Sequence, residues 1–161
     1  MDLTQWFSAT PAGEFFYTLL IAMVPVIELR GAIPVGVAMG LQPLTALLAA
    51  IIGNMLPIPF ILLFIRHIFN WMRTHMPKLG GLVDKMEAKA HLKGQKVTRY
   101  KYLGLFIFVA IPLPGTGAWT GALVAAFLDM RLKSALPAIF AGVMTAGVIV
   151  TALTYGIFSM F

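Results

Sequence analysis

The chain contains no cysteine among its 161 residues. It therefore forms no disulfide, offers no thiolate to a metal ion and has no cysteine nucleophile. Charged residues are also scarce, at 11% of the chain, against about 25% in soluble globular domains. Hydrophobic residues make up 60%, which is more apolar surface than one small soluble core can hide. The composition therefore predicts an integral membrane protein.

Several signals of other protein classes are missing. Residues 1–13 have no basic segment, and no small-residue cleavage site follows the first apolar stretch, so we expect no cleaved signal peptide. No Gly-Lys-Ser/Thr sequence follows the glycines near residue 117, and no serine lies in a nucleophile elbow. His67, His75 and His91 lack acidic partners at metal-ligand spacing. We therefore expect no enzyme activity, no cofactor and no metal site.

The positive charge is concentrated in one segment. Nine of the twelve basic residues lie between Arg66 and Lys101, and apolar stretches flank this segment. Basic runs can bind nucleic acid, but between apolar spans the positive-inside rule places residues 66–101 in a cytoplasmic loop. We expect the protein in the cytoplasmic (inner) membrane, with membrane lipids and no nucleic acid as partners. Apolar residues at helical spacing predict either an amphipathic helix on the inner leaflet or a solvated loop: Leu79, Leu82, Val83, Met86 and Ala90.

Four apolar blocks occupy the rest of the chain, at residues 14–40, 43–65, 102–128 and 135–161. A spanning helix needs about 20 apolar residues, so the second and fourth blocks predict one crossing each. Prolines predict a kink in the second block. The first block is interrupted at residues 28–34 and the third at residues 112–121, in both cases by proline and glycine. These interruptions leave two interpretations open. Each is either a kinked spanning helix, giving a four-helix transmembrane bundle, or a re-entrant hairpin that enters and leaves on one side.

The flanking charges favour the hairpins. Hairpins place Arg131 and Lys133 on the side of the basic loop, whereas four spans place them opposite to it. The predicted fold is therefore all-α and integral to the membrane, with one domain over residues 1–161. Two inverted repeats, at residues 14–65 and 102–161, each consist of a re-entrant helical hairpin followed by a transmembrane helix. Two crossings make a thin wall around a cavity, so we expect a homodimer.

Polar residues inside the interrupted blocks are the candidates for function. A charge at the bilayer centre costs about 3 kcal/mol on insertion scales, so Glu28 and Arg30 must face a partner or a wet cavity. Either they pin the hairpin turn as an ion pair, or Arg30 binds an anionic head group while Glu28, withdrawn from water, exchanges a proton.

The interrupted run in the third block and one buried amide complete the candidate site. Pro112–Gly121 is either a helix kink or a ligand-binding backbone, in which a helix starting near Gly117 points its positive end at an anion. Asn54 either joins helices or contacts substrate. The predicted substrate-binding residues are Glu28, Arg30, Gly31, Pro34, Asn54, Pro112, Pro114, Gly115, Thr116, Gly117, Trp119, Thr120 and Gly121.

Two motifs carry a family resemblance. With Glu-Leu-Arg-Gly-Ala-Ile-Pro at residues 28–34 and Pro-Leu-Pro-Gly-Thr-Gly-Ala-Trp-Thr-Gly at residues 112–121, the chain resembles the small multidrug export proteins and, more distantly, the DedA/VTT superfamily. The resemblance implies paired re-entrant hairpins in inverted repeat, and movement of lipid carriers such as polyprenyl phosphates with proton coupling. Glu28 matches the acidic residue of a first hairpin motif. The second tip has Pro-Gly-Thr-Gly-Ala-Trp where DedA-type members carry arginines.

Three functions remain open at this point. The leading hypothesis is a transporter of an amphipathic anion, such as a polyprenyl phosphate or a phospholipid, gripped by Arg30 and the glycine amides and coupled to protons through Glu28. The first alternative is a proton-coupled exporter of small cationic drugs, in which Glu28 binds both proton and cation. The second alternative is a membrane scaffold or assembly factor, whose polar tips are satisfied internally and enclose no cavity.

Overall fold

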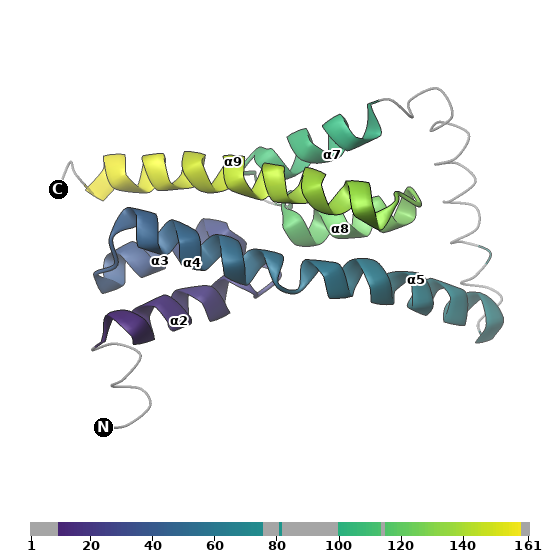
Figure 1. Ribbon diagram of the computed structural model, residues 1–161, viewed down its shortest axis with the longest axis horizontal. Coiled ribbons are helices and arrows are strands. Elements are labelled where there is room, and N and C mark those ends of the chain that lie inside the picture. Colours follow the sequence, from purple (N-terminus) through teal and green to yellow (C-terminus); the bar gives the residue numbers. More distant parts are fainter. Residues whose placement is uncertain (1–9, 76–80, 82–99, 114, 159–161) are drawn as a thin grey trace.

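The computed structural model describes residues 10–75, 81, 100–113 and 115–158, and within these ranges its regular elements are α-helices (Figure 1). This confirms the predicted all-helical class. In chain order, its helices include α2 (Pro11–Ala22), α3 (Glu28–Met39), α4 (Pro43–Met55), α5 (Ile58–His75), α7 (Lys101–Ala110), α8 (Ala118–Phe127) and α9 (Leu132–Phe158).

Helices α2 and α3 form an antiparallel hairpin. Thr10 caps α2, since its hydroxyl accepts from the backbone N–H of Gly13 at 3.1 Å. The chain turns back after Ala22. Gly36 of α3 then lies against Thr18, and Gly40 lies near the Glu14 carboxylate, so the open end of the hairpin is at residues 14 and 40.

The turn of this hairpin is not where the sequence places it. The predicted interruption at residues 28–34 is wrong, because these residues form the first turns of α3 and the chain reverses at residues 23–27 instead. Pro25 lies in this turn and cannot continue a helix. Pro34 is accommodated inside α3, although it cannot donate a hydrogen bond to the carbonyl of Arg30.

Two apolar helices are long enough to cross a membrane. By length and composition these are Pro43–Ile65 and Leu132–Gly156, which agrees with the two predicted crossings. The predicted kink in the first is confirmed, since α4 ends at Met55 and α5 begins at Ile58, after Pro57. The predicted loop over residues 66–101 is wrong in its first part, because α5 continues to His75. The predicted amphipathic residues Leu79, Leu82, Val83, Met86 and Ala90 lie outside the described residues.

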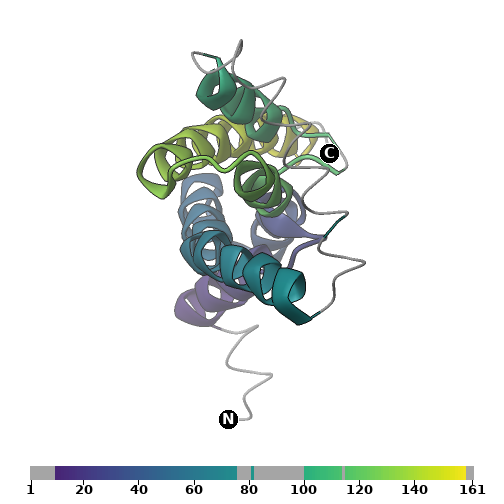
Figure 2. The ribbon, with the colours of Figure 1, turned by 90° about the vertical axis from the view of Figure 1, so that its right-hand side faces the viewer.

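Helices α7 and α8 form a second hairpin, and residues 111–113 and 115–117 between them, which we call the 111–117 segment, are irregular. The predicted break at Pro112–Gly121 is thus confirmed over its first part, whereas residues 118–121 belong to α8. Val109 near the end of α7 lies against Gly121 in the first turn of α8. In Figure 1 the two hairpins open towards opposite ends of the molecule, and their closed tips meet in the middle. Viewed from the end (Figure 2), α8 lies between α5 and α9, which it contacts.

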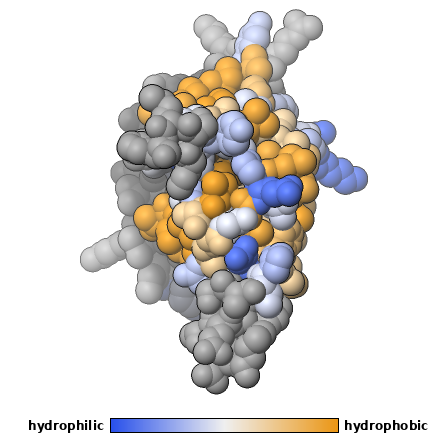
Figure 3. Space-filling view, turned by 90° about the vertical axis from the view of Figure 1, so that its left-hand side faces the viewer, coloured by the Kyte–Doolittle hydropathy of each residue, from blue (hydrophilic) through white to orange (hydrophobic). Residues whose placement is uncertain are grey.

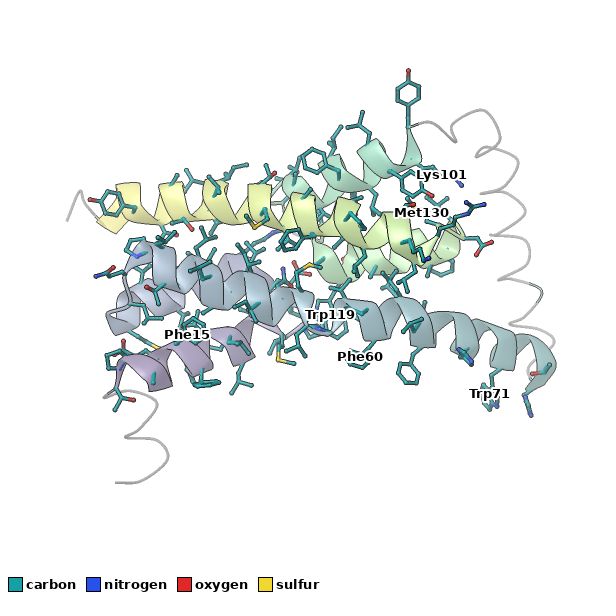
Figure 4. All side chains as sticks on the ribbon, viewed as in Figure 1. Phe15, Phe60, Trp71, Lys101, Trp119 and Met130 are labelled. Atoms are coloured by element: carbon teal, nitrogen blue, oxygen red, sulfur yellow. The ribbon has the colours of Figure 1, made fainter. Side chains whose placement is uncertain are left out.

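The described helices therefore match the hairpin interpretation and differ from a bundle of four kinked spans. Figure 4 places Lys101 and Met130 in the same half of the molecule as Trp71, so α9 starts in the half in which α5 ends. That the two halves form an inverted repeat stays a prediction, as do the re-entrant insertion and the cytoplasmic side of residues 66–101.

Small residues bring the helices together, while large apolar side chains face outwards. Gly142 of α9 lies against Val109 of α7, and Gly147 lies against Leu47 of α4. Such close approach is typical of helix packing in membranes. The exposed residues include Val26 and Leu44, which are 92% and 67% exposed. Figure 3 shows hydrophobic side chains over much of one end of the molecule, and an apolar exterior of this extent suits contact with lipid.

Single cysteines test the hairpin topology, because the chain has none of its own. We expect cysteines placed at Thr10 and Gln42 to react from one side of the membrane, and those at Thr74 and Lys133 from the other, with a membrane-impermeant maleimide in oriented vesicles. A four-span bundle predicts that positions 10 and 133 exchange sides while 42 and 74 keep theirs, so positions 42 and 74 are the controls.

Gly53→Ala tests the packing of α4 on the first hairpin. A Cβ atom at this position would collide with the backbone carbonyl of Leu19 and would lie 3.0 Å from the Cβ of Ala22. We expect a loss of about 1–3 kcal/mol, as for other overpacked sites, measured by thermal unfolding in detergent. Gly156→Ala is the control, because nothing lies within 4 Å of its added Cβ. Equal unfolding temperatures for the two variants would contradict the observed packing.

Candidate functional site

Arg30 joins the two hairpins. From the first turn of α3 its guanidinium donates to the backbone carbonyl of Leu113, to that of Ile111 at 3.2 Å and to the Thr116 hydroxyl at 2.9 Å. The last carbonyls of a helix have no intrahelical donor, and Ile111 is the residue that ends α7. The backbone N–H groups of Leu113 and Thr116 also donate to the carbonyls of Ile111 and Leu113. Arg30 adds charged donors to the same two carbonyls from a different hairpin.

Thr116 completes this arrangement. Its hydroxyl lies 2.7 Å from the carbonyl of Ile111 and 2.9 Å from that of Leu113, and it can donate to either while accepting from Arg30. The segment between α7 and α8 is thus held by a network of side-chain and backbone groups although it has no regular structure.

Glu28 makes the complementary contact with α8. Its side chain is buried, and one carboxylate oxygen accepts from the backbone N–H of Trp119 at 3.2 Å. The N–H of Ala118 is a further donor to the same carboxylate. A carboxylate at the N-terminus of a helix is stabilised by the free N–H groups and by the helix dipole. Glu28 therefore occupies the N-terminal end of α8.

The backbone at this contact is unusual on both sides. Glu28 has φ +50°, a left-handed conformation that costs a residue with a side chain of its kind about 1–2 kcal/mol. Gly117, which precedes α8, has φ +150°, and a Cβ atom there would collide with the Glu28 carboxylate. Strained residues of this kind concentrate at functional sites. Glycine at residue 117 is required for both the backbone angle and the close approach.

We call this contact the tip junction, and define it as Glu28 and Arg30 of α3 together with residues 111–113 and 115–119 of the second hairpin. Figure 4 places Trp119 between the end of the molecule marked by Phe15 and the end marked by Trp71. Both charges of the junction thus lie well inside the long axis of the protein. Among the described residues of the junction, they are the only charged side chains.

Several buried polar atoms have no hydrogen-bond partner among the described residues. Two belong to the tip junction, namely Nε of Arg30 and Nε1 of Trp119, and two belong to the amide of Asn54. Asn54 has no exposed surface. It follows Gly53, which packs on Leu19 and Ala22 at the closed end of the first hairpin. Unsatisfied buried donors are rare in folded proteins and call for a physical explanation.

The structure brings together Glu28, Arg30, Thr116, Gly117 and Trp119 from the predicted site. The other predicted residues surround them or lie elsewhere: Pro112 and Gly115 are in the 111–117 segment, Thr120 is in the first turn of α8, Gly31 lies against Ile27, Gly121 lies against Val109, Pro34 is farther along α3, Asn54 is in α4, and Pro114 is outside the described residues. Their part in binding a substrate stays a prediction.

Two partners were not identified from the sequence, namely the carbonyls of Ile111 and Leu113. Their side chains are apolar and carry no signal of a polar contact. The signal lies in the sequence that follows, because Pro112 cannot continue the helix. Where a helix ends inside an apolar block, the carbonyls that follow it can accept from a donor of another segment.

A comparison with protein-family models identifies a family for most of the chain. Residues 28–149 match the family described as "Putative small multi-drug export protein", which is more than half of the chain. The match begins at Glu28 and extends through the tip junction into α9. Comparisons with curated proteins and with solved structures give no match.

Gly117→Ala tests the contact between the hairpins. The added methyl group would displace the Glu28 carboxylate, and alanine disfavours a φ of +150°. We expect thermal unfolding in detergent to show a loss of about 1–3 kcal/mol. Gly104→Ala is the matched control, because this glycine of α7 has open space around its added Cβ. Full stability of Gly117→Ala would show that the two tips do not touch in this way.

Proposed function

The chain belongs to the small multi-drug export protein family, and we propose that it is an integral membrane transporter whose substrate site is the tip junction. In this proposal the two hairpins enter the bilayer from opposite sides, and α4–α5 and α9 cross it. The observation that carries the proposal is the meeting of two opposite charges with a broken backbone segment far from both ends of the protein.

The physical environment supports a transport role. Irregular backbone at membrane depth is tolerated only where protein covers it or where it lines a cavity. Ionisable side chains at that depth are expensive and mark substrate or proton pathways in transporters. Interrupted segments in matching positions of two halves are also typical of transporter binding sites. In this proposal the 23–27 turn and the 111–117 segment are such a pair.

We propose an amphipathic anion as the substrate, of the class of phospholipids and polyprenyl phosphates. The junction holds two donors, Nε of Arg30 and Nε1 of Trp119, that are buried without an acceptor among the described residues. A phosphate head group supplies oxygen acceptors and pairs with guanidinium in a bidentate manner. The apolar exterior, with residues such as Val26 and Leu44 exposed, suits the lipid chain of the same substrate.

Two other functions each have one observation in their favour. The family description names multi-drug export, which favours a proton-coupled exporter of cationic drugs that uses the Glu28 carboxylate. Arg30 and the N-terminus of α8 lie around that carboxylate and would repel a cation. The internal hydrogen bonds of Glu28 and Arg30 favour a scaffold, but the unpartnered donors of the junction do not.

A homodimer, with residues 66–101 at the cytoplasmic face, completes the proposal.

Arg30→Gln tests the proposed function in liposomes. We expect purified protein to move a fluorescent anionic phospholipid between leaflets, measured as the fraction that external dithionite quenches. The variant should be slower by about ten- to a hundredfold, because a hydrogen bond to a charged group contributes about 1.5–3 kcal/mol.

Lys133→Gln is the matched control, because it removes one positive charge at the start of α9, away from the tip junction. We expect it to keep the wild-type rate of lipid movement. Ethidium accumulation in proton-loaded liposomes is measured in parallel. Movement of ethidium without lipid movement would favour the drug exporter. If neither probe moves, the scaffold explains the protein better.

A further inference from the structure

The Glu28 carboxylate lies in a place that is chemically suited to an external anion. It accepts from the backbone N–H of Trp119 and from that of Ala118, at the N-terminus of a helix of ten residues. Arg30, two residues away in α3, adds a positive charge to the same environment. Donors of these types bind phosphate and carboxylate groups in many proteins. Here a side chain of the chain itself holds that position.

A buried amide next to the first hairpin's tip is a second, independent indication of a ligand. Gly36 of α3 lies 3.2 Å from Ala46 of α4, measured from an added Cβ. The two helices are joined at residues 40–42 and run antiparallel. Glu28 lies eight residues before Gly36 in α3, and Asn54 lies eight residues after Ala46 in α4. Because the helices run antiparallel, both residues lie at the same height along the helix axes. Asn54 has no exposed surface, and neither atom of its amide has a hydrogen-bond partner among the described residues.

We propose that the Glu28 carboxylate is a resident occupant of an anion site, and that a substrate anion replaces it when Glu28 takes up a proton. The donors of the site are the N-terminus of α8, Arg30 and the Asn54 amide. This inference rests on the proposed function, because it assigns a regulation to the same site. It differs from a simple proton relay, since the proton and the anion must arrive together.

The charge balance of the site explains the coupling. With Glu28 ionised, its negative charge and the positive charge of Arg30 compensate each other. A second anion would leave one uncompensated negative charge in a buried place, which is costly. Protonation of Glu28 removes that charge and releases the N–H groups of α8 for the incoming anion. One proton therefore accompanies each singly charged anion.

No other charged group shares this environment among the described residues. Helices α4 and α8 contain no ionisable residue. The acid of α2, Glu14, lies at the open end of the hairpin near Gly40. Lys101 of α7 lies at the opposite end of the molecule from that hairpin opening (Figure 4), as does the start of α9. The charged or dipolar groups that act on Glu28 are thus Arg30 and the N-terminus of α8, in addition to the burial of its side chain.

A binding experiment on the full chain tests the inference. Trp6→Phe and Trp71→Phe leave Trp119 as the sole tryptophan, so its fluorescence reports on the tip junction in phosphatidylcholine nanodiscs. The probe is decanesulfonate, whose charge is constant between pH 5 and pH 8. We expect its Kd to fall by about tenfold or more from pH 8 to pH 5, because binding of the anion is linked to uptake of one proton. In Glu28→Gln the Kd should be low at both values.

The outcomes separate the alternatives. Equal binding of decanesulfonate at both pH values in the wild-type chain, or no binding at all, would overturn the inference, and this holds even if Glu28→Gln does not fold. Decyltrimethylammonium, a cation with the same chain length, should not displace decanesulfonate. If sulfate competes for the site as strongly as unlabelled decanesulfonate does, the natural ligand is a free anion. If sulfate competes only weakly, the natural ligand is the head group of a lipid.

Failure of this inference differs from failure of the proposed function. If lipid does not move in liposomes while decanesulfonate still binds with the expected pH dependence, the transport function is wrong and the anion site remains. If lipid moves while decanesulfonate binds equally at both pH values, the transport function remains and the exchange with Glu28 is wrong.

Discussion

The arrangement of this protein depends on two opposite charges in the first turn of α3, each of which stabilises a different part of the second hairpin. Glu28 accepts from the N-terminus of α8, and Arg30 donates to the carbonyls of Ile111 and Leu113, which follow α7. Neither charge and neither helix end is tolerable alone in an apolar environment. Because each group satisfies another, the two hairpins can meet by their tips in the middle of the protein. The apolar packing of α4 and α9 surrounds this contact without replacing it.

Much of the fold follows from hydropathy and from the prolines and glycines. The apolar lengths of residues 43–65 and 135–161 are sufficient for the two long helices, and the kink follows from Pro57. Glu28 and Arg30 stand out as candidates because charges inside an apolar block require partners. The choice between hairpins and four spans followed from the positions of Arg131 and Lys133. Charge distribution thus carried topological information that hydropathy alone did not.

Other features depend on contacts that the sequence does not display. The first turn lies at residues 23–27, which carry only apolar side chains and include one proline. The charged residues Glu28 and Arg30, which come next, belong to helix α3. Polarity indicated a turn where tertiary contacts stabilise a helix. Arg30 donates to backbone carbonyls of apolar residues, so the type of side chain at these positions does not predict the contact. The extension of α5 to His75 was also hidden, because basic residues indicate a side of the membrane and do not exclude a helix.

The spacing of Glu28 and Arg30 has a consequence for how such a sequence can change over time. Each charge is compensated by the other and by one end of the second hairpin, so losing either one leaves a buried charge without its counterpart, a defect of several kcal/mol. A lineage that exchanges these residues one at a time therefore passes through a less stable intermediate. Substitutions in the 111–117 segment face the same barrier, since that segment is shaped by both charges. Divergence in this protein is freer on its outer, lipid-facing helical surfaces than at the point where its halves meet.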